Sequence, residues 1–183
     1  MGSGFTDPPI QAAHAFRAAM TAMACPGDIK EVAALRAPAG LSTAAATLLL
    51  TLTDGTTPVH LAGSSDRDEI KQWLTFHTGA PLSDASGAAF ALGTWDSLLP
   101  LDRFQTGTPE YPDRSATLIV EMPELSNSGN RLTGPGIQTE TSLSLPDSLA
   151  FQRNARLFPL GLDFFFTAGD RLAALPRTTK VDA

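Results

Sequence analysis

The chain has 183 residues, enough for one domain and short for two, so we expect residues 1–183 to form a single domain. Its 13 lysines and arginines against 19 aspartates and glutamates give a formal net charge of −6. This balance argues against nucleic acid as a partner, because binding a polyanion requires a dense basic surface. No run approaches the ~20 apolar residues of a membrane span, and the N-terminus lacks a signal-peptide pattern. With Cys25 as the one cysteine, an internal disulfide is excluded, and we expect a cytoplasmic protein.

Helical signals dominate the first third of the chain. Residues 9–24 carry an apolar stripe at helical spacing, formed by Ala13, Phe16, Met20 and Met23. Residues 43–53 are rich in alanine and leucine and predict a second helix, followed by an extended run over 57–61. A third helix is expected from Asp66, with Glu69 as the other half of a capping box.

Strand signals become more frequent after residue 81. Short β-prone runs occur at 88–92, 117–120 and 131–133, and a last helix is predicted over 146–157 with Phe151, Ala155 and Phe158 on one face. Residues 162–167 contain three successive phenylalanines, which indicates a strand covered on both sides. Gly169-Asp170 predicts a two-residue hairpin into a final strand over 172–175. The fold class is therefore α/β, with a mixed β-sheet flanked by helices.

Motifs for catalysis or metal binding are not evident. The three histidines are far apart, and with one cysteine a zinc site has almost no support, so no metal is expected. The sequence has no Walker motif and no G-x-G-x-x-G. We therefore assign no catalytic residue.

Two pairs of residues in helices are candidates for binding a ligand or a partner. His14 and Arg17 are three apart on the first helix and can receive a phosphate or carboxylate. The alternative is that Arg17 pairs with a structural carboxylate. His77 and Thr78 close the third helix, where the helix dipole favours a protonated imidazole. The alternative is a core histidine that caps loose carbonyls.

A third group of candidates lies near the C-terminus. Arg177 and Thr178 follow Pro176 at the end of a buried-type strand, where a fork-shaped donor and hydroxyl groups can hold an anion. They can equally anchor the C-terminus or a partner chain. Asp163 begins the phenylalanine-rich strand, where a carboxylate needs a partner, so Asp163 and Arg177 can also neutralise each other.

An ordered set of short strings across residues 9–180 resembles the H-subunit family of the bacterial carbon–phosphorus lyase system. No single string is diagnostic, but their order and spacing together are specific. The strings are His14-Ala15-Phe16-Arg17, Pro26-Gly27, Leu50-Thr51-Leu52, Thr57-Pro58-Val59, Phe76-His77-Thr78, Ala80-Pro81-Leu82, Gly107-Thr108, Ala116-Thr117-Leu118-Ile119, Leu132-Thr133-Gly134-Pro135-Gly136-Ile137, Phe158-Pro159-Leu160-Gly161 and Pro176-Arg177-Thr178-Thr179.

The resemblance implies a fold similar to a reduced pyridoxal-phosphate-dependent transferase. It also implies a homodimer in isolation that joins subunits G, I and J in a core complex. That system forms a ribose 1-(alkyl)phosphonate 5-triphosphate from a nucleoside triphosphate and an alkylphosphonate. The H subunit is required in it without an established catalytic role, so the isolated chain is expected to be inactive. The competing hypothesis is a small-molecule enzyme or ligand-binding subunit with an anion site built from His77 and Arg177.

No cofactor is expected, despite the implied fold. Pyridoxal phosphate requires a lysine amine held in a pocket as a Schiff base. The chain has three lysines. Lys180 is close to the C-terminus, Lys71 lies on a charged helix segment, and Lys30 lies beside acidic residues. All three contexts predict solvent-facing amines.

Overall fold

The computed structural model describes residues 4–33 and 35–182, and in this part of the chain nine strands form two sheets. The larger sheet has six strands in the order β1-β8-β7-β4-β3-β2. Its strands β2, β3, β4 and β7 are parallel, β8 is antiparallel to β7, and β1 is antiparallel to β8, so the sheet is mixed. The smaller sheet has the antiparallel order β6-β5-β9. The strands are β1 Lys30–Glu31, β2 Val59–Leu61, β3 Phe90–Thr94, β4 Thr117–Glu121, β5 Asn130–Thr133, β6 Thr141–Leu143, β7 Asp163–Ala168, β8 Arg171–Leu175 and β9 Lys180–Asp182.

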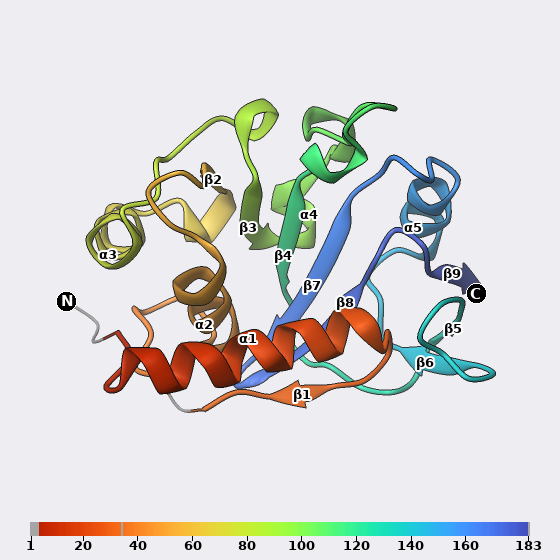
Figure 1. The fold of residues 1–183 in the computed structure, drawn as a ribbon, viewed down its shortest axis with the longest axis horizontal. Helices are drawn as coiled ribbons and strands as arrows, with labels where there is room; N and C mark the ends of the chain where they lie inside the picture. The colour runs from red at the N-terminus through yellow and green to blue at the C-terminus, as the bar shows by residue number, and fades with distance from the viewer. Residues whose placement is uncertain (1–3, 34, 183) are drawn as a thin grey trace.

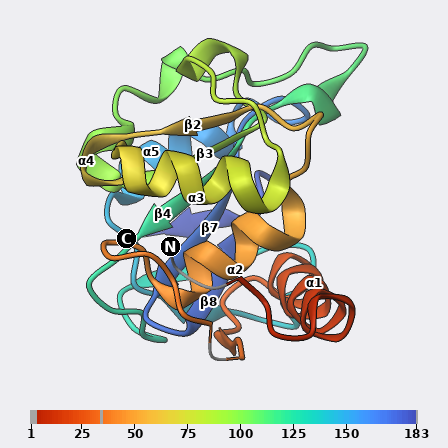
Figure 2. The same ribbon diagram turned by 90° about the vertical axis from the view of Figure 1, so that its left-hand side faces the viewer.

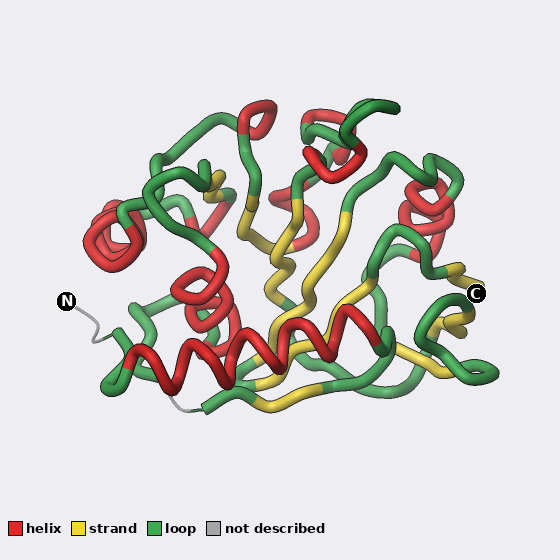
Figure 3. Tube along the Cα trace, viewed as in Figure 1, coloured by secondary structure: helices red, strands yellow, loops and turns green. Residues whose placement is uncertain are grey.

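Helices cover both faces of the larger sheet. The α-helices described are α1 Pro8–Ala24, α2 Thr43–Leu52, α3 Asp68–Thr78, α4 Trp95–Leu98 and α5 Ser148–Ala155. Helices α1, α2 and α3 lie side by side on one face (Figure 2). The opposite face is covered by α4, α5 and the smaller sheet, which lies at the right of Figure 1. The strands therefore occupy the centre of the molecule, with helices outside them (Figure 3).

Strand periodicity explains why the sheet has two hydrophobic cores. In β7, Phe165 points to the α1–α3 side, whereas Phe164 and Phe166 point to the α5 side. Ile119 and Leu118 of β4 divide between the two faces in the same way. Successive side chains of a strand alternate between faces, so a strand covered on both sides reads as a continuous apolar run. The three phenylalanines thus have the two-sided burial that their sequence predicts.

Helix α1 differs from the expected packing. Its contacts with the core are made by Ala15, Ala19 and Ala22, all of which are buried. Phe16 and Met20, from the predicted apolar stripe, are 50% and 56% exposed. Met23, the last member of the stripe, is half-buried and packs against the core. Small side chains let the helix approach α2 and β8 closely, and Phe16 and Met20 are left outside.

Two local predictions were wrong. Helix α3 begins at Asp68 after Arg67, and no side chain caps its N-terminus, because Asp66 binds Lys71 (2.6 Å) in place of a capping interaction. Helix α5 ends at Ala155, two residues before the predicted end. Phe158 therefore leaves the face that carries buried Phe151 and is 60% exposed.

The hairpin predicted at Gly169-Asp170 is present. It joins β7 to β8 with Ala168 opposite Arg171, and Gly169 has a φ of 60°, which a glycine adopts without strain. Its two carbonyl oxygens also accept hydrogen bonds from distant residues. The Val32 amide donates to Asp170, and the Ala44 amide donates to Gly169, both at 2.9 Å. The turn thus forms hydrogen bonds with two segments from the N-terminal third of the chain.

Candidate functional site

The residues singled out from the sequence lie on separate elements. His14 and Arg17 are on α1, His77 and Thr78 end α3, and Asp163, Arg177 and Thr178 lie around the ends of β7 and β8. Figure 1 places α3 at one end of the molecule and the segment that follows β8 towards the other. The anion site expected from His77 together with Arg177 is therefore not assembled by the fold.

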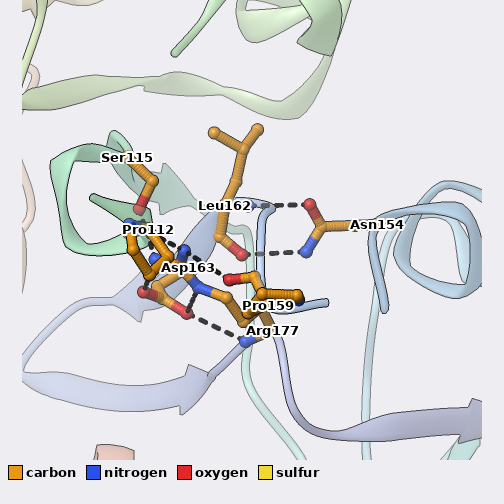
Figure 4. A network of polar contacts seen from close by, with 7 residues as sticks. All are labelled: Pro112, Ser115, Asn154, Pro159, Leu162, Asp163 and Arg177. Carbon is orange, nitrogen blue, oxygen red and sulfur yellow. Dashed lines mark hydrogen bonds and ion pairs between the residues drawn. The ribbon is translucent and has the colours of Figure 1, made fainter. Parts of the chain in front are cut away.

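Arg177 lies at the centre of the largest polar network among these residues (Figure 4). Its backbone amide and Nε both donate to Oδ1 of Asp163, at 2.9 and 3.1 Å, and Nη2 lies 2.5 Å from Oδ2. Nη1 donates to the carbonyl oxygens of Pro112 (2.8 Å) and Pro159 (3.4 Å), and Nη2 also donates to Oγ of Ser115. The guanidinium is thus engaged by the protein itself. Of the alternatives, mutual neutralisation of Asp163 and Arg177 is the one observed.

A second buried contact supports the same corner of the molecule. Asn154 of α5 is 7% exposed, and its amide group makes two reciprocal bonds with the backbone of Leu162. Nδ2 donates to the carbonyl of Leu162, and the amide of Leu162 donates to Oδ1, both at 2.8 Å. Asn154 thereby fixes α5 to the start of β7 beside the Arg177 network (Figure 4).

The position of this network in the sheet also disfavours a ligand. Asp163 is the first residue of β7, and β8 is antiparallel to β7, so Arg177 lies at the amino end of the parallel strands. Ligands of open α/β sheets bind at the carboxyl ends. At that end, Glu121 of β4 accepts a bond from the Ser42 amide (2.7 Å) and another from Oγ1 of Thr167 (3.0 Å). A carboxylate of the chain itself therefore binds the N-terminus of α2.

Thr78 has a structural role at the end of α3. Its Oγ1 donates to the Leu74 carbonyl (2.8 Å) and accepts from the Ala80 amide (3.0 Å), which caps the helix before the turn at Gly79. The His77 ring lies 5.3 Å from the ring of Trp73 and 5.0 Å from that of Phe76, which is 70% exposed. His77 is thus held in an aromatic cluster. Thr178 is half-buried in the turn that leads into β9.

His14 and Arg17 do not share a cavity. His14 lines a hollow of about 170 Å³ between α1, α2 and β1, together with Glu31 and Thr47. Oγ1 of Thr47 is buried there, and no hydrogen-bond partner for it occurs in the described part of the chain. Arg17 is exposed, and the carboxylate partner weighed for it is not found among residues 4–33 and 35–182.

A cavity beside β2 contains residues that the sequence did not indicate. It measures about 500 Å³, and His60, Asp66, Lys71, Ser83 and Asp84 line its polar part. The His60 ring is fixed by a 3.0 Å contact between Nδ1 and the Ser83 carbonyl. The alternation of β2 (Val59 and Leu61 buried, His60 half-buried) is the one signal that could have placed His60 outside the core.

The lysines do not fit the requirements of pyridoxal phosphate. A Schiff-base lysine needs an amine whose pKa is lowered by burial or by a neighbouring cation. Lys71 does line the large cavity, but its hydrogen bond to Asp66 raises the pKa of the ammonium above its ordinary value. Lys30 binds Asp28 (2.9 Å), and Lys180 is exposed on β9.

The described residues contain neither a candidate metal site nor a membrane-spanning helix. Nowhere in that part of the chain do three or more histidine, cysteine or acidic side chains gather as a metal would require. The helices described there are also too short or too polar to cross a bilayer.

Two exposed apolar surfaces remain. The first, which we call the α1 face, is formed by Ile10, Ala13, Phe16 and Met20 on the outer side of α1. The second lies at α5 and the turn after it, where Leu149, Leu157 and Phe158 are 60%, 48% and 60% exposed. Apolar surfaces of this kind on a small protein commonly mark interaction sites.

Comparison with known proteins gives the family. The model of the PhnH family, described as "Bacterial phosphonate metabolism protein (PhnH)", matches residues 3–182. The chain belongs to the PhnH family. A relative from Rhizobium meliloti (strain 1021), "Alpha-D-ribose 1-methylphosphonate 5-triphosphate synthase subunit PhnH", is 38% identical over 188 residues, covering 97% of this chain and 94% of the relative. A second relative, "Putative C-P lyase subunit protein HtxG" from Stutzerimonas stutzeri, is 30% identical over 179 residues, covering 92% of this chain and 84% of the relative.

Proposed function

We propose that this chain is a cytoplasmic, non-catalytic subunit of the carbon–phosphorus lyase system of phosphonate catabolism. It works with subunits G, I and J to form a ribose 1-(alkyl)phosphonate 5-triphosphate from a nucleoside triphosphate and an alkylphosphonate. The observation that carries this proposal is the family match over residues 3–182, together with a 38% identical relative that is named a subunit of the corresponding synthase.

The polar contacts support a structural rather than a catalytic role. Arg177 and Asp163 neutralise each other, and Thr78 caps α3. Glu121 binds the N-terminus of α2 at the sheet edge where ligands of such folds bind. Arg177, Thr78 and Glu121 are therefore engaged in holding the fold.

The α1 face supports a homodimer. A two-fold interface brings the same surface of both copies together, so the surface must be self-complementary. Helix α1 carries one formally charged residue, Arg17, over its 17 residues. Its side chains Ile10, Phe16 and Met20 are each at least half exposed. Two copies of this face bury apolar side chains and bring few like charges together.

The fold is proposed to be a reduced form of the pyridoxal-phosphate-dependent transferases that does not bind their cofactor. The mixed sheet with helices on both faces supports the likeness, and the pKa of Lys71 supports the loss of cofactor binding. Incubation with pyridoxal phosphate, followed by borohydride, is expected to leave all three lysines unmodified. A stoichiometric adduct on one lysine would contradict the proposal.

Reconstitution tests the function directly. Subunits G, I and J of the same organism are purified, mixed with ATP and methylphosphonate, and assayed for adenine release with and without this chain. We expect release to depend on the chain, to be absent with the chain alone, and to survive the substitution His77→Ala in it. Full activity without the chain would overturn the proposal, as would ATP turnover by the chain alone that His77→Ala abolishes.

A further inference from the structure

The network around Arg177 brings two surface loops together. Nη1 of Arg177 donates to the carbonyls of both Pro112 and Pro159, which belong to the loop before β4 and the turn after α5. The amide of Gly161 also donates to the carbonyl of Thr106 (3.0 Å), so the two loops are joined at a second point. The residues that precede the two prolines, Tyr111 and Phe158, are 50% and 60% exposed. Arg177 thus supports an exposed surface built from two distant segments.

This surface continues along α5. Leu149 and Arg153 are four residues apart, which places them on the same side of α5, and exposed Leu157 lies in the turn that follows Ala155. We define the α5 face by its apolar and cationic members, which are Tyr111, Leu149, Leu157, Phe158, Arg114, Arg153 and Arg156.

Cations are concentrated on the α5 face although the chain is acidic overall. Arg153 and Arg156 are exposed, and no carboxylate pairs with either of them in the described residues. No aspartate or glutamate occurs from residue 148 to residue 162. Arg114 stacks on the ring of Tyr111 at 4.1 Å. The exposed carboxylates Glu110 and Asp113 lie on the neighbouring loop, and Asp147 caps the N-terminus of α5, so the formal charges between residues 148 and 162 are those of Arg153 and Arg156.

Charge decides what this face can bind. If two copies met through it, Arg153 and Arg156 of one copy would approach the same arginines of the other, and like charges brought together across an interface are unfavourable. An apolar surface with unpaired guanidinium groups is instead complementary to an apolar surface bordered by carboxylates.

We propose that the α5 face docks a different protein, one that presents acidic side chains around an apolar patch. Given the proposed function, on which this inference rests, that protein is a subunit of the G–I–J assembly. Phe158 and Leu157 supply the apolar contact, and the two arginines of α5 supply orientation and specificity.

A binding titration against the purified G–I–J assembly tests the proposal. The fluorescently labelled chain is titrated, and its Kd is compared with that of the double variant Arg153→Glu/Arg156→Glu. We expect the variant to bind about tenfold or more weakly, and Phe158→Ala to weaken binding as well. Arg153→Lys/Arg156→Lys keeps both charges and is expected to retain most of the affinity. Because all these side chains are exposed, circular dichroism is expected to show unchanged folding.

A control of equal charge change separates docking from net charge. Arg36→Glu/Arg67→Glu alters two exposed cations that precede α2 and α3, on the other side of the larger sheet, and is expected to bind with unchanged Kd. Unchanged affinity of Arg153→Glu/Arg156→Glu would overturn the inference while leaving the proposed function intact. An equal loss in the control variant would also overturn it, because net charge alone would then explain the effect. Failure of the unaltered chain to bind the assembly would overturn the proposed function and this inference together.

Discussion

The α1 face and the α5 face are both apolar and both helical, but they differ in charge. The α1 face surrounds Phe16 and Met20 and has Arg17 as the one formal charge on its helix. The α5 face surrounds Phe158 and carries Arg153 and Arg156 without a carboxylate on its helix. Hydrophobic burial is non-directional, so apolar area by itself does not select a partner. Charge makes the selection, because a cationic surface is repelled by its own copy and attracted by an acidic one.

The largest expected effect concerns the α1 face. Phe16→Asp combined with Met20→Asp places four carboxylates in a two-fold interface, where unpaired charges are costly to bury. We expect the dimer Kd to rise about a hundredfold or more, measured by analytical ultracentrifugation. Phe76→Asp, which alters a still more exposed ring on α3, is the control and should leave the dimer intact. A dimer that survives the double substitution would place self-association elsewhere.

Removing Arg177 breaks the support of the α5 face. The Arg177 and Asp163 side chains are 12% and 24% exposed, and loss of the Arg177 guanidinium leaves the Asp163 carboxylate unpaired. Arg177→Ala is expected to lower the free energy of unfolding by about 3 kcal/mol in a urea titration. It should also weaken docking to the G–I–J assembly more than dimerisation. Arg177→Lys keeps the charge but cannot reach Asp163, Pro112 and Pro159 together, so it should recover only part of the stability.

A substitution beneath the α1 face is expected to stabilise the protein. The hydroxyl of Thr47 is buried on α2 without a partner among residues 4–33 and 35–182, and Thr47→Val removes it while keeping the branched shape. We expect a gain of about 1 kcal/mol in the free energy of unfolding, with dimerisation and docking unchanged. Thr53→Val is the matched control, because the Thr53 hydroxyl donates to the Leu49 carbonyl (2.8 Å) and its loss should not stabilise. Equal effects of the two substitutions would contradict this reasoning.

The smallest effect belongs to a residue on neither face. Hydrogen bonds from the Thr56 amide, and then from the Thr56 and Thr57 hydroxyls, lower the pKa of Asp54 below its ordinary 3.8. A carboxyl group with a lowered folded-state pKa contributes stability above its unfolded pKa and loses that contribution as the pH falls through the folded value. Asp54→Asn is therefore expected to flatten the stability–pH curve slightly below about pH 4. The measurement is urea unfolding at several acidic pH values, and an unchanged slope would argue against this assignment.

Local sequence patterns were sufficient for the elements that span several turns or a full buried strand. The apolar run before Gly169-Asp170 indicates a buried strand, and Gly169-Asp170 indicates a tight turn directly after it, so both β7 and its hairpin could be predicted. The small sheet could not, because β6 and β9 have three residues each and their pairing depends on distant segments. The exposure of Phe16 and Met20 on α1 could not be predicted either. Alanines of this helix face the core, and periodicity alone does not say which of two apolar stripes is buried.

The candidate site was predicted only as far as charge neutrality required. A carboxylate at the start of a buried strand needs a partner, which made Arg177 a candidate for Asp163. The other acceptors of Arg177 are Pro112, Ser115 and Pro159, the first two of them 65 and 62 residues away in sequence. A backbone carbonyl, which is the acceptor in both prolines, leaves no compositional signal. No role was predicted for His60, and a lone histidine in a short strand has no pattern that reveals a neighbouring cavity.

The hairpin at Gly169-Asp170 has a consequence for the order in which the chain can fold during synthesis. Val32 and Ala44 leave the ribosome early, yet their hydrogen-bond partners are carbonyls more than a hundred residues later. Helix α1 likewise packs on β8, and β1 pairs with β8. Contacts of such long sequence separation slow folding, and they cannot form before the last strands exist. The N-terminal third therefore lacks its contacts with β8 and with the Gly169-Asp170 hairpin until the final strands of the larger sheet have been synthesised.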